Sequence, residues 1–414
     1  MTWLPKSVVC LSYYDLPRFR SDVFAALILS LLLFPLAIAI AIASGVHPFY
    51  GIYSAAIAGL LASAFGDSKI RVSAPNVVFI AVASSIVARE GVLALSLSTL
   101  LSGVLLMFFG AIGLGTAIQG IPRPVALGFT TGIAVLIVSQ QLPPLLGSSS
   151  QIPADQIPWG SMTVVRHSML IEPHAIILGI AALILIGART RAFRYVPAGL
   201  IAIIIGALLV RFEHFPVRTI EAFYESNLTS FHLHLTGPFR VDLLGSILAQ
   251  AFAIAVLVGN ESLQAIGLAN TLTGEHINPD GELLVHGGVN IASAFAGGLP
   301  ASGVSSYTSE NAHVGAQTPI AGILQAVFLL VLLLLIAPLV RFIPLPVISA
   351  IILASVCGMT NWREIPQLIK DRRLESGAWL ATSFLTVATD LPVAIAAGML
   401  IALFLYVRQQ RLAS

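Results

Sequence analysis

An acidic residue and a proline-containing run interrupt regions of this chain that are otherwise strongly apolar. Glu261 lies inside the stretch 243–265, and Pro300 lies inside the stretch 294–311. At the centre of a membrane a charged side chain costs about 2.5–3.5 kcal/mol or more, so Glu261 is a candidate for carrying a proton or orienting a substrate. The alternative role for Glu261 is structural, as a protonated carboxyl that is hydrogen-bonded to broken backbone nearby.

The run around Pro300 predicts a half-helix with an exposed positive end. Two glycines precede it, and Pro300 favours an extended conformation for Leu299. Because proline also suits the first position of a helix, we expect a half-helix that begins at Pro300. The free N–H groups of Ala301, Ser302 and Gly303 would then attract an anion. Broken backbone at membrane depth is tolerated only inside protein or beside water, so the run is a candidate transport site.

A second run has the same design. Residues 70–74 are expected to be extended, Pro75 to begin a half-helix, and Asn76 to offer a donor and an acceptor beside it. Two half-helices whose N-terminal ends converge would enclose a binding site. The candidate substrate-binding residues are Leu36, Ala74, Asn76, Ala301, Ser302, Gly303, Ser306 and Tyr307. The sequence leaves two alternatives for Ser306 and Tyr307: they line the binding site, or they pack beside it.

Composition indicates a protein that crosses the lipid bilayer many times. Hydrophobic residues make up 57% of the 414 and charged residues 10%, whereas a soluble domain carries about 25% charge. The net charge of +2, without a basic cluster, gives no reason to expect nucleic acid as a partner. Cys10 and Cys357 fit no metal-ligand spacing, and no nucleophile–base arrangement indicates an enzyme.

Fourteen segments are expected to cross the membrane, at about 20 apolar residues per span. They are 22–45, 49–66, 71–88, 92–114, 121–141, 173–189, 196–212, 243–265, 281–296, 299–312, 318–338, 343–359, 375–390 and 391–409. The third and the tenth are the broken runs, each predicted to hold a short strand and a half-helix. Most Lys and Arg residues fall on the side of the N-terminal segment 1–21, which places both termini in the cytoplasm and the connection 213–242 outside.

Short motifs recur in the two halves of the chain. Ile121–Val125 recurs as Ile343–Val347, and the prolines of the two broken runs occupy matching positions. The repeats would be 22–212 and 243–409, with seven spans each, and an odd number inverts the second repeat relative to the first. The predicted fold class is therefore an all-α polytopic membrane protein built from two inverted repeats.

Motifs along the whole apolar part of the chain resemble the SulP anion transporters, the bacterial relatives of solute carrier family 26. The matching motifs are Phe34–Gly45, Tyr50–Tyr53, Gly128–Gly132, Gln141–Gly147, Gly259–Leu263, Gly297–Gly303, Gly315–Gly322 and Ala337–Leu339. The resemblance implies a uracil-transporter-like fold with a core domain (spans 1–4 and 8–11) and a gate domain (spans 5–7 and 12–14). It also implies an elevator-type carrier of small anions that forms a homodimer in the bacterial inner membrane.

Some features depart from that family. Many members have Arg at the position of Tyr307 and an apolar or small residue at that of Glu310. Without the Arg, anion binding would rest on helix ends, each worth about half an elementary charge, which argues against a strongly charged substrate such as sulfate. Many members also carry a cytoplasmic STAS domain after the last span, whereas this sequence ends at Ser414.

The expected function is secondary active transport of a small anion, coupled to protons through Glu261 and needing no cofactor. The cargo class is a carboxylate or dicarboxylate, bicarbonate or a sulfate-like oxyanion. Sodium is the alternative coupling ion: some family carriers hold it at the positions of Asn270 and Thr273 with an acid, but position 270 has no carboxylate here. Two other functions are open. A nucleobase–proton symporter of the same fold is loosely suggested by Tyr307 and Glu310, and an anion channel is the other.

Overall fold

The computed structural model describes residues 5–148, 172–188, 197–213, 215–222, 241–359, 362, 364–371, 373–389, 392–401 and 404. Of the predicted connection 213–242, residues 214 and 223–240 lie outside this described part. The helices and strands follow in the order α1 (Lys6–Cys10), η1 (Leu11–Tyr13), α2 (Leu16–Ala43), α3 (Pro48–Phe65), β1 (Ser73–Pro75), η2 (Val77–Phe79), α4 (Ile80–Glu90), α5 (Val92–Ala111), α6 (Gly115–Gln119), α7 (Arg123–Leu145), α9 (Pro173–Gly187), α10 (Ala198–Glu213), η5 (Ile220–Ala222), η6 (Val241–Leu243), α11 (Leu244–Thr273), α12 (Pro279–Phe295), β2 (Ala301–Gly303), α13 (Ser305–Val314), α14 (Ile320–Val340), α15 (Leu345–Met359), α16 (Ile365–Asp371) and α17 (Arg373–Ala388). A further apolar helix spans Pro392–Ile401.

Local sequence features fix several helix starts. α2 begins after Asp15, whose carboxylate accepts the Arg18 N–H at 3.0 Å. α12 begins after Asn278, whose side-chain oxygen accepts the Asp280 N–H at 2.9 Å. Both are side-chain caps with a proline at the start of the helix, which is the usual chemistry of a helix N-terminus.

Six of the described helices are long and apolar enough to cross a membrane: α2, α3, α5, α7, α11 and α14. α9, α15 and Pro392–Ile401 are shorter apolar helices. Each of the fourteen segments expected from the sequence contains a helix within the described part of the chain. Several boundaries differ: α2 begins earlier, at Leu16, α7 continues to Leu145, and α11 continues as far as Thr273.

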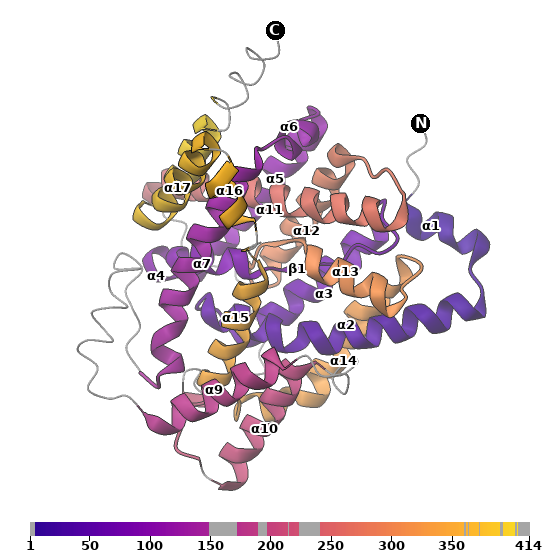
Figure 1. The fold of residues 1–414 in the computed structure, drawn as a ribbon. Coiled ribbons are helices and arrows are strands. Elements are labelled where there is room, and N and C mark those ends of the chain that lie inside the picture. Colours follow the sequence, from indigo (N-terminus) through magenta and orange to yellow (C-terminus); the bar gives the residue numbers. More distant parts are fainter. Residues whose placement is uncertain are drawn as a thin grey trace.

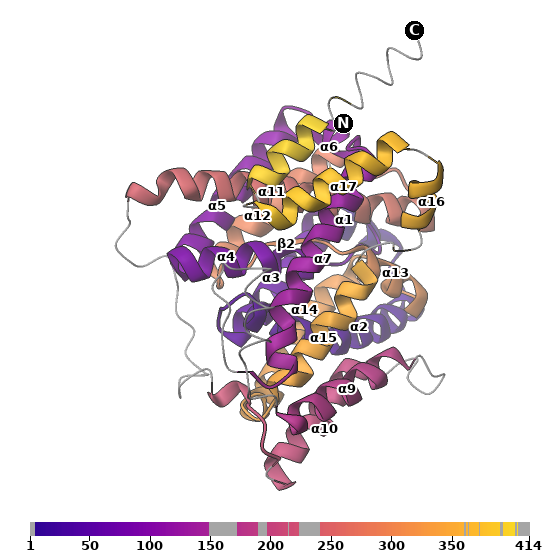
Figure 2. The same ribbon diagram turned by 60° about the vertical axis from the view of Figure 1, so that its left-hand side comes forward.

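Two short strands lie in the middle of the molecule, with helices around them (Figure 1, Figure 2). β1 pairs antiparallel with β2, with Ala74 opposite Ser302 and Pro75 opposite Ala301. α2 and α3 pack on β1, whereas α11 and α12 pack on β2. The third and tenth predicted segments are thus joined as one small sheet, although they lie in different halves of the chain.

Neither half-helix begins at its proline. Pro75 is the last residue of β1, and the helical stretch after it begins with η2 at Val77. The second half-helix does not begin at Pro300 either. Residues 301–303 form β2, and α13 begins at Ser305 with Val304 as its N-cap. The prediction that Ala301, Ser302 and Gly303 form the start of a helix is therefore wrong. The reason is tertiary: β1 offers these residues backbone partners, and satisfying buried backbone groups outweighs the preference of proline for a helix start.

The helices form two groups by packing. In the first group α5 packs on α12 and α11, and α14 packs on α3 and α2. In the second group α7 packs on α17 and α15, and α15 packs on α9. Contacts between the groups run mainly from α2 to α10 and α15, and from α4 to α7. In both ribbon views α9 and α10 lie at the bottom, and α16 and α17 lie near the top.

Candidate substrate site

Helix α11 contacts both broken runs through two consecutive residues. Glu261 Oε2 accepts a hydrogen bond from Asn76 Nδ2 at 2.9 Å. Ser262 Oγ accepts one from the Gly303 N–H at 3.0 Å. Asn76 is the N-cap of the helical stretch that η2 begins and α4 continues. Because Glu261 and Ser262 belong to one continuous helix, α11 holds the two runs in a fixed relation to each other.

The backbone N–H groups of β2 are already used by the protein. Ala301 donates to Asn290 Oδ1 at 3.0 Å, and Gly303 donates to Ser262. Ser302 faces β1 within the antiparallel pair. The anion cradle of free N–H groups that was predicted at 301–303 is therefore wrong. Its donors are consumed by contacts that come from α11, α12 and β1.

The side chain of Asn290 takes the place of a third strand beside β2. Its Nδ2 donates to the Ala301 carbonyl at 2.8 Å while its Oδ1 accepts the Ala301 N–H. Ala301 therefore directs both backbone groups away from β1, and the opposing Pro75 needs no N–H. This explains how a proline is accommodated inside the antiparallel pair.

The positive end of the second half-helix lies at residues 305–307. Thr308 donates the first backbone bond, to the Val304 carbonyl at 2.9 Å, and Val304 supplies no side-chain cap. The N–H groups of Ser305, Ser306 and Tyr307 have no hydrogen-bond partner within the described part of the chain. Such first-turn groups carry partial positive charge. Ser306 and Tyr307, two of the predicted site residues, thus contribute their backbone N–H groups to this positive helix end.

The predicted site residues lie on elements that meet at the sheet. Ala74 and Ser302 are buried and face each other across it. Ser306 is exposed, and Tyr307 is partly buried against the main hydrophobic cluster. Leu36 is buried in that cluster, on α2, which packs on both β1 and α13. Leu36 therefore contributes apolar packing on an element beside the two broken runs.

A row of buried polar residues on α12 was not predicted. Glu282, His286, Asn290 and Ser293 recur at intervals of four, four and three, which places them on one side of the helix. Each is at most 2% exposed. His286 Nε2 lies 3.2 Å from the hydroxyl of Ser73, in β1. The spacing of these four residues can be seen in the sequence. Judged by hydropathy, however, their polarity only makes 281–296 a weak candidate for a membrane span.

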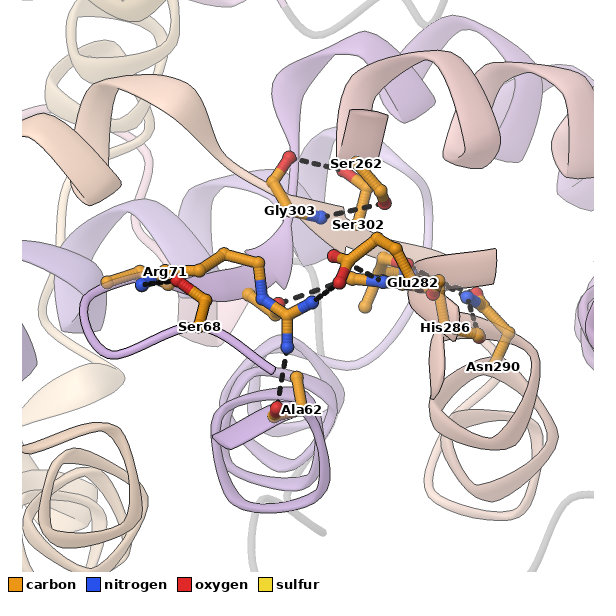
Figure 3. Close-up of polar contacts among 12 residues, drawn as sticks. Ala62, Ser68, Arg71, Ser262, Glu282, His286, Asn290, Ser302 and Gly303 are labelled. Atoms are coloured by element: carbon orange, nitrogen blue, oxygen red, sulfur yellow. Dashed lines mark hydrogen bonds and ion pairs between the residues drawn. The ribbon is translucent and has the colours of Figure 1, made fainter. Parts of the chain in front are cut away.

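Arg71 reaches α12 from the loop before β1 (Figure 3). Its guanidinium forms an ion pair with Glu282 and donates to the Ala62 carbonyl at 2.5 Å. Glu282 Oε1 also lies 3.1 Å from His286 Nδ1. Arg71 is 4% exposed and Glu282 2%, and burying two such charges requires that they neutralise each other. Arg71 is therefore committed to Glu282.

Polar residues of α13 hold the chain that leads into β1. Thr308 Oγ1 accepts the Val72 N–H at 3.2 Å. Asn311 Nδ2 donates to the Ile70 carbonyl at 2.8 Å. Both side chains are buried. α13, the second half-helix, thus stabilises the extended chain at residues 70–72, which leads into β1. The sequence did not predict this role for Thr308 and Asn311.

The residues considered for sodium are used to end α11. Asn270 Oδ1 accepts the Ile277 N–H at 3.1 Å, and Thr273 Oγ1 donates to the Ala269 carbonyl at 2.8 Å. Gly274 follows in the left-handed conformation with φ 70°, which is common just after a helix. These contacts account for Asn270 and Thr273 as parts of a helix terminus.

Comparison with known proteins agrees with the motifs. Residues 19–382 match the sulfate permease family. YvdB of Bacillus subtilis is 30% identical over 401 residues, which cover 96% of this chain and 75% of YvdB. The bicarbonate transporter BicA of Picosynechococcus sp. is 26% identical over 394 residues, which cover 92% of this chain and 69% of BicA.

The fold is shared with a solved transporter structure. The transmembrane domain of a cyanobacterium bicarbonate transporter BicA gives a TM-score of 0.83 at 23% identity, covering 92% of this chain and 98% of that domain. The resemblance found in the motifs is thereby confirmed, as is the expectation of a transporter in place of an enzyme. This chain belongs to the sulfate permease family, the SulP group of membrane anion transporters related to solute carrier family 26.

Proposed function

We propose that this protein is a proton-coupled secondary transporter whose cargo is a carboxylate, a dicarboxylate or bicarbonate in preference to sulfate. One observation carries the proposal: Glu261 holds Asn76 while the next residue, Ser262, holds Gly303. An ionisable side chain within a membrane helix thus contacts the cap of one half-helix. Its neighbour contacts the strand that leads into the other. Membership of an anion transporter family supports the choice of an anion.

The anion would bind between Asn76 and the first turn of α13. The N–H groups of residues 305–307 supply about half an elementary charge there. Arg71 precedes β1, but its charge is neutralised by Glu282. Tyr307 brings no side-chain charge. A site built from helix ends suits bicarbonate or a single carboxylate group, including one end of a dicarboxylate, better than sulfate, whose two charges lie on one small group.

Protonation of Glu261 would link the proton to the anion. As a carboxylate, Glu261 repels a nearby anion and holds the Asn76 amide, because hydrogen bonds to a charged acceptor are strong. Protonation removes the negative charge and weakens that hold. The Asn76 amide is then available to the substrate, so the proton and the anion would bind together.

The two packing groups support a core and a gate that move relative to each other. The core would contain α2–α5 with β1 and α11–α14 with β2, and the gate α7, α9, α10, α15, α17 and Pro392–Ile401. In this proposal the core carries the sheet and its bound anion past the gate, as in an elevator. The repeats 22–212 and 243–409 would be inverted copies that each supply one strand and one half-helix.

The proposed setting is the bacterial inner membrane, with both termini in the cytoplasm and two copies forming a homodimer. The support is the excess of Lys and Arg on one side of the predicted spans and the family resemblance. Cysteine accessibility at each end of the chain, measured in whole cells and in inverted vesicles, tests the orientation. Cross-linking in the membrane tests the dimer.

Uptake into proteoliposomes tests the function. Purified protein is reconstituted, and accumulation of labelled bicarbonate, succinate, sulfate and uracil is measured with and without a proton or a sodium gradient. We expect saturable uptake of at least one anion, faster with an inward proton gradient and independent of sodium. Uptake driven by sodium alone contradicts the coupling ion. Uptake of uracil but of no anion identifies a nucleobase carrier, and non-saturable conductance identifies a channel.

A further inference from the structure

Helix α12 contacts both strands of the central sheet through its buried polar row. His286 Nε2 lies 3.2 Å from the Ser73 hydroxyl in β1. One turn along the same helix, Asn290 bonds both backbone groups of Ala301 in β2. The single helix α12 therefore fixes the positions of both β1 and β2.

We propose that His286 and Asn290 are positioning residues for anion binding, and that Arg71 and Glu282 hold His286 in place. The inference rests on the proposed function. β1 leads within a few residues to Asn76, the cap of the first half-helix, and β2 leads directly to Ser305, the start of the second. An extended chain advances about 3.3 Å per residue and is close to its maximum length, so it cannot absorb a shift by stretching. A shift of Ser73 or Ala301 is therefore passed on to the groups that contact the anion.

The orientation of His286 is fixed from both sides of the ring. Nδ1 lies 3.1 Å from Glu282 Oε1, and Nε2 lies 3.2 Å from Ser73 Oγ. The hydrogen-bond partner of Nδ1 is the Glu282 main-chain carbonyl, 3.2 Å away, with the Glu282 carboxylate beside it. A neutral imidazole that donates from Nδ1 to this carbonyl accepts the Ser73 hydroxyl at Nε2. The carboxylate is in turn paired with Arg71. Figure 3 shows the guanidinium of Arg71 directed at Glu282, with His286 and Asn290 following along α12.

The polar row is not needed to attach α12 to the protein. α12 already packs closely on α5, where a Cβ added at Gly103 would lie 2.6 Å from the Gly287 carbonyl. The side chains of His286 and Asn290 instead contact the strands. A packing role alone would be met by apolar side chains of similar size, whereas these contacts specify the placement of β1 and β2.

Transport kinetics of variants at positions 73 and 286 test the inference. The wild type is measured first, with labelled bicarbonate, succinate and sulfate; if none is taken up, the proposed function fails before the inference is reached. Ser73→Ala and His286→Leu should each raise KM by about three- to tenfold, the loss of one or two hydrogen bonds, with little change in maximal rate. His286→Gln should restore a KM near that of the wild type, because its amide can both donate and accept.

Two further measurements separate positioning from folding. The double variant Ser73→Ala/His286→Leu should have a KM no higher than the worse single variant, because both changes break one contact. The rise in Tm that each anion causes in detergent should shrink in parallel with the change in KM. Should His286→Leu fail to fold, Ser73→Ala decides alone, since it removes only a hydroxyl.

The matched control is Gln325→Leu. Gln325 is 0% exposed, lies on α14 and has no hydrogen-bond partner for its amide in the described part of the chain. The same polar-to-leucine change there should leave KM unchanged. The inference is overturned if Ser73→Ala keeps the wild-type KM, if the effects of the two single changes add in the double variant, or if Gln325→Leu raises KM as much as His286→Leu.

Discussion

At the scale of single residues, two acids on the helices that pack on β2 have opposite surroundings. Glu282 is buried and faces the cation Arg71 and the imidazole of His286. Glu261 accepts a hydrogen bond from one neutral partner, Asn76. An acid that is paired with a buried cation keeps its charge, because losing it would leave the cation uncompensated. Glu261 has no such constraint, and this difference is why we place proton coupling there and a structural role at Glu282.

Replacing Glu261 with Gln should abolish the dependence of uptake on the proton gradient without unfolding the protein. Gln keeps an acceptor for Asn76 but cannot change its charge. Initial rates in proteoliposomes with and without a pH gradient measure the effect, and the Tm in detergent checks folding. The matched control is Glu310→Gln in α13, where the acid is partly exposed and gradient dependence should remain. Wild-type coupling in Glu261→Gln would move the coupling role elsewhere.

Removing Arg71 alone should cost more stability than removing both members of its ion pair. Arg71→Met leaves the Glu282 carboxylate buried without its cation, an effect of about 3–5 kcal/mol. Arg71→Met/Glu282→Leu removes both charges and should recover most of that loss. Unfolding of the detergent-solubilised variants measures the difference. If the loss of stability in the double variant equalled the sum of the losses caused by Arg71→Met and by Glu282→Leu, the two side chains would not act as a pair.

At the scale of elements, the central sheet exists because two broken runs complete each other. Each run interrupts a helix and leaves backbone groups without local partners, and such groups must be satisfied within the membrane. The pairing of β1 with β2 meets this need on one edge. Asn290 and Ser262 meet it on the outer edge of β2. The sheet is therefore stable only with α11 and α12 packed beside it.

The close approach of α5 and α12 gives a prediction at this scale. Gly103→Ala should destabilise the protein by about 1–3 kcal/mol, as overpacking does, because the new Cβ would lie 2.6 Å from the Gly287 carbonyl. Gly288→Ala on the same α12 is the control: a Cβ there meets nothing within 4 Å. That change should be neutral or stabilise by up to about 1 kcal/mol through helix propensity. Equal Tm values for the two variants would contradict the packing.

Sequence reasoning located these elements but not all their boundaries. The apolar runs predicted the helices because the membrane itself requires about 20 such residues per span. The prolines at 75 and 300 indicated two breaks, and both occur. The predicted start of each half-helix was wrong because proline preference is local, whereas β1 and β2 form only when the two halves of the chain come together. The polar row of α12 was overlooked because its partners lie on β1, β2 and the loop before β1.

At the scale of the whole molecule, the described helices fall into the two packing groups, here called two bodies, and few polar contacts join them within the described part of the chain. One such link joins α4 to α7, where Gln140 Nε2 donates to Ser84 Oγ at 3.0 Å. The adjacent Gln141 makes its contact within the second body, accepting from Ser349 on α15 at 3.2 Å. Neighbouring residues on one helix therefore face different bodies, which makes them a matched pair for testing relative motion.

A disulfide across the two bodies should arrest transport, and one within the second body should not. After replacement of Cys10 and Cys357, the free cysteines, the pair Ser84→Cys/Gln140→Cys is oxidised or bridged with a short thiol cross-linker. Uptake should stop and return on reduction of the disulfide. The control Gln141→Cys/Ser349→Cys should cross-link and still transport. Undiminished uptake by a fully cross-linked Ser84→Cys/Gln140→Cys protein would exclude a core that moves past a gate.

The amino-acid sequence was enough to predict a polytopic membrane transporter of the SulP family, the approximate positions of its helices, and the exceptional character of Glu261 and the two proline runs. These properties follow from hydropathy, local backbone preferences and motifs, which are carried by neighbouring residues. Three features became apparent only in the folded protein: the N–H groups of Ala301 and Gly303 are already hydrogen-bonded, the positive helix end lies at residues 305–307, and α12 holds both strands. The physical reason is that a buried hydrogen-bonding group must find a partner, and here the partners come from distant parts of the chain.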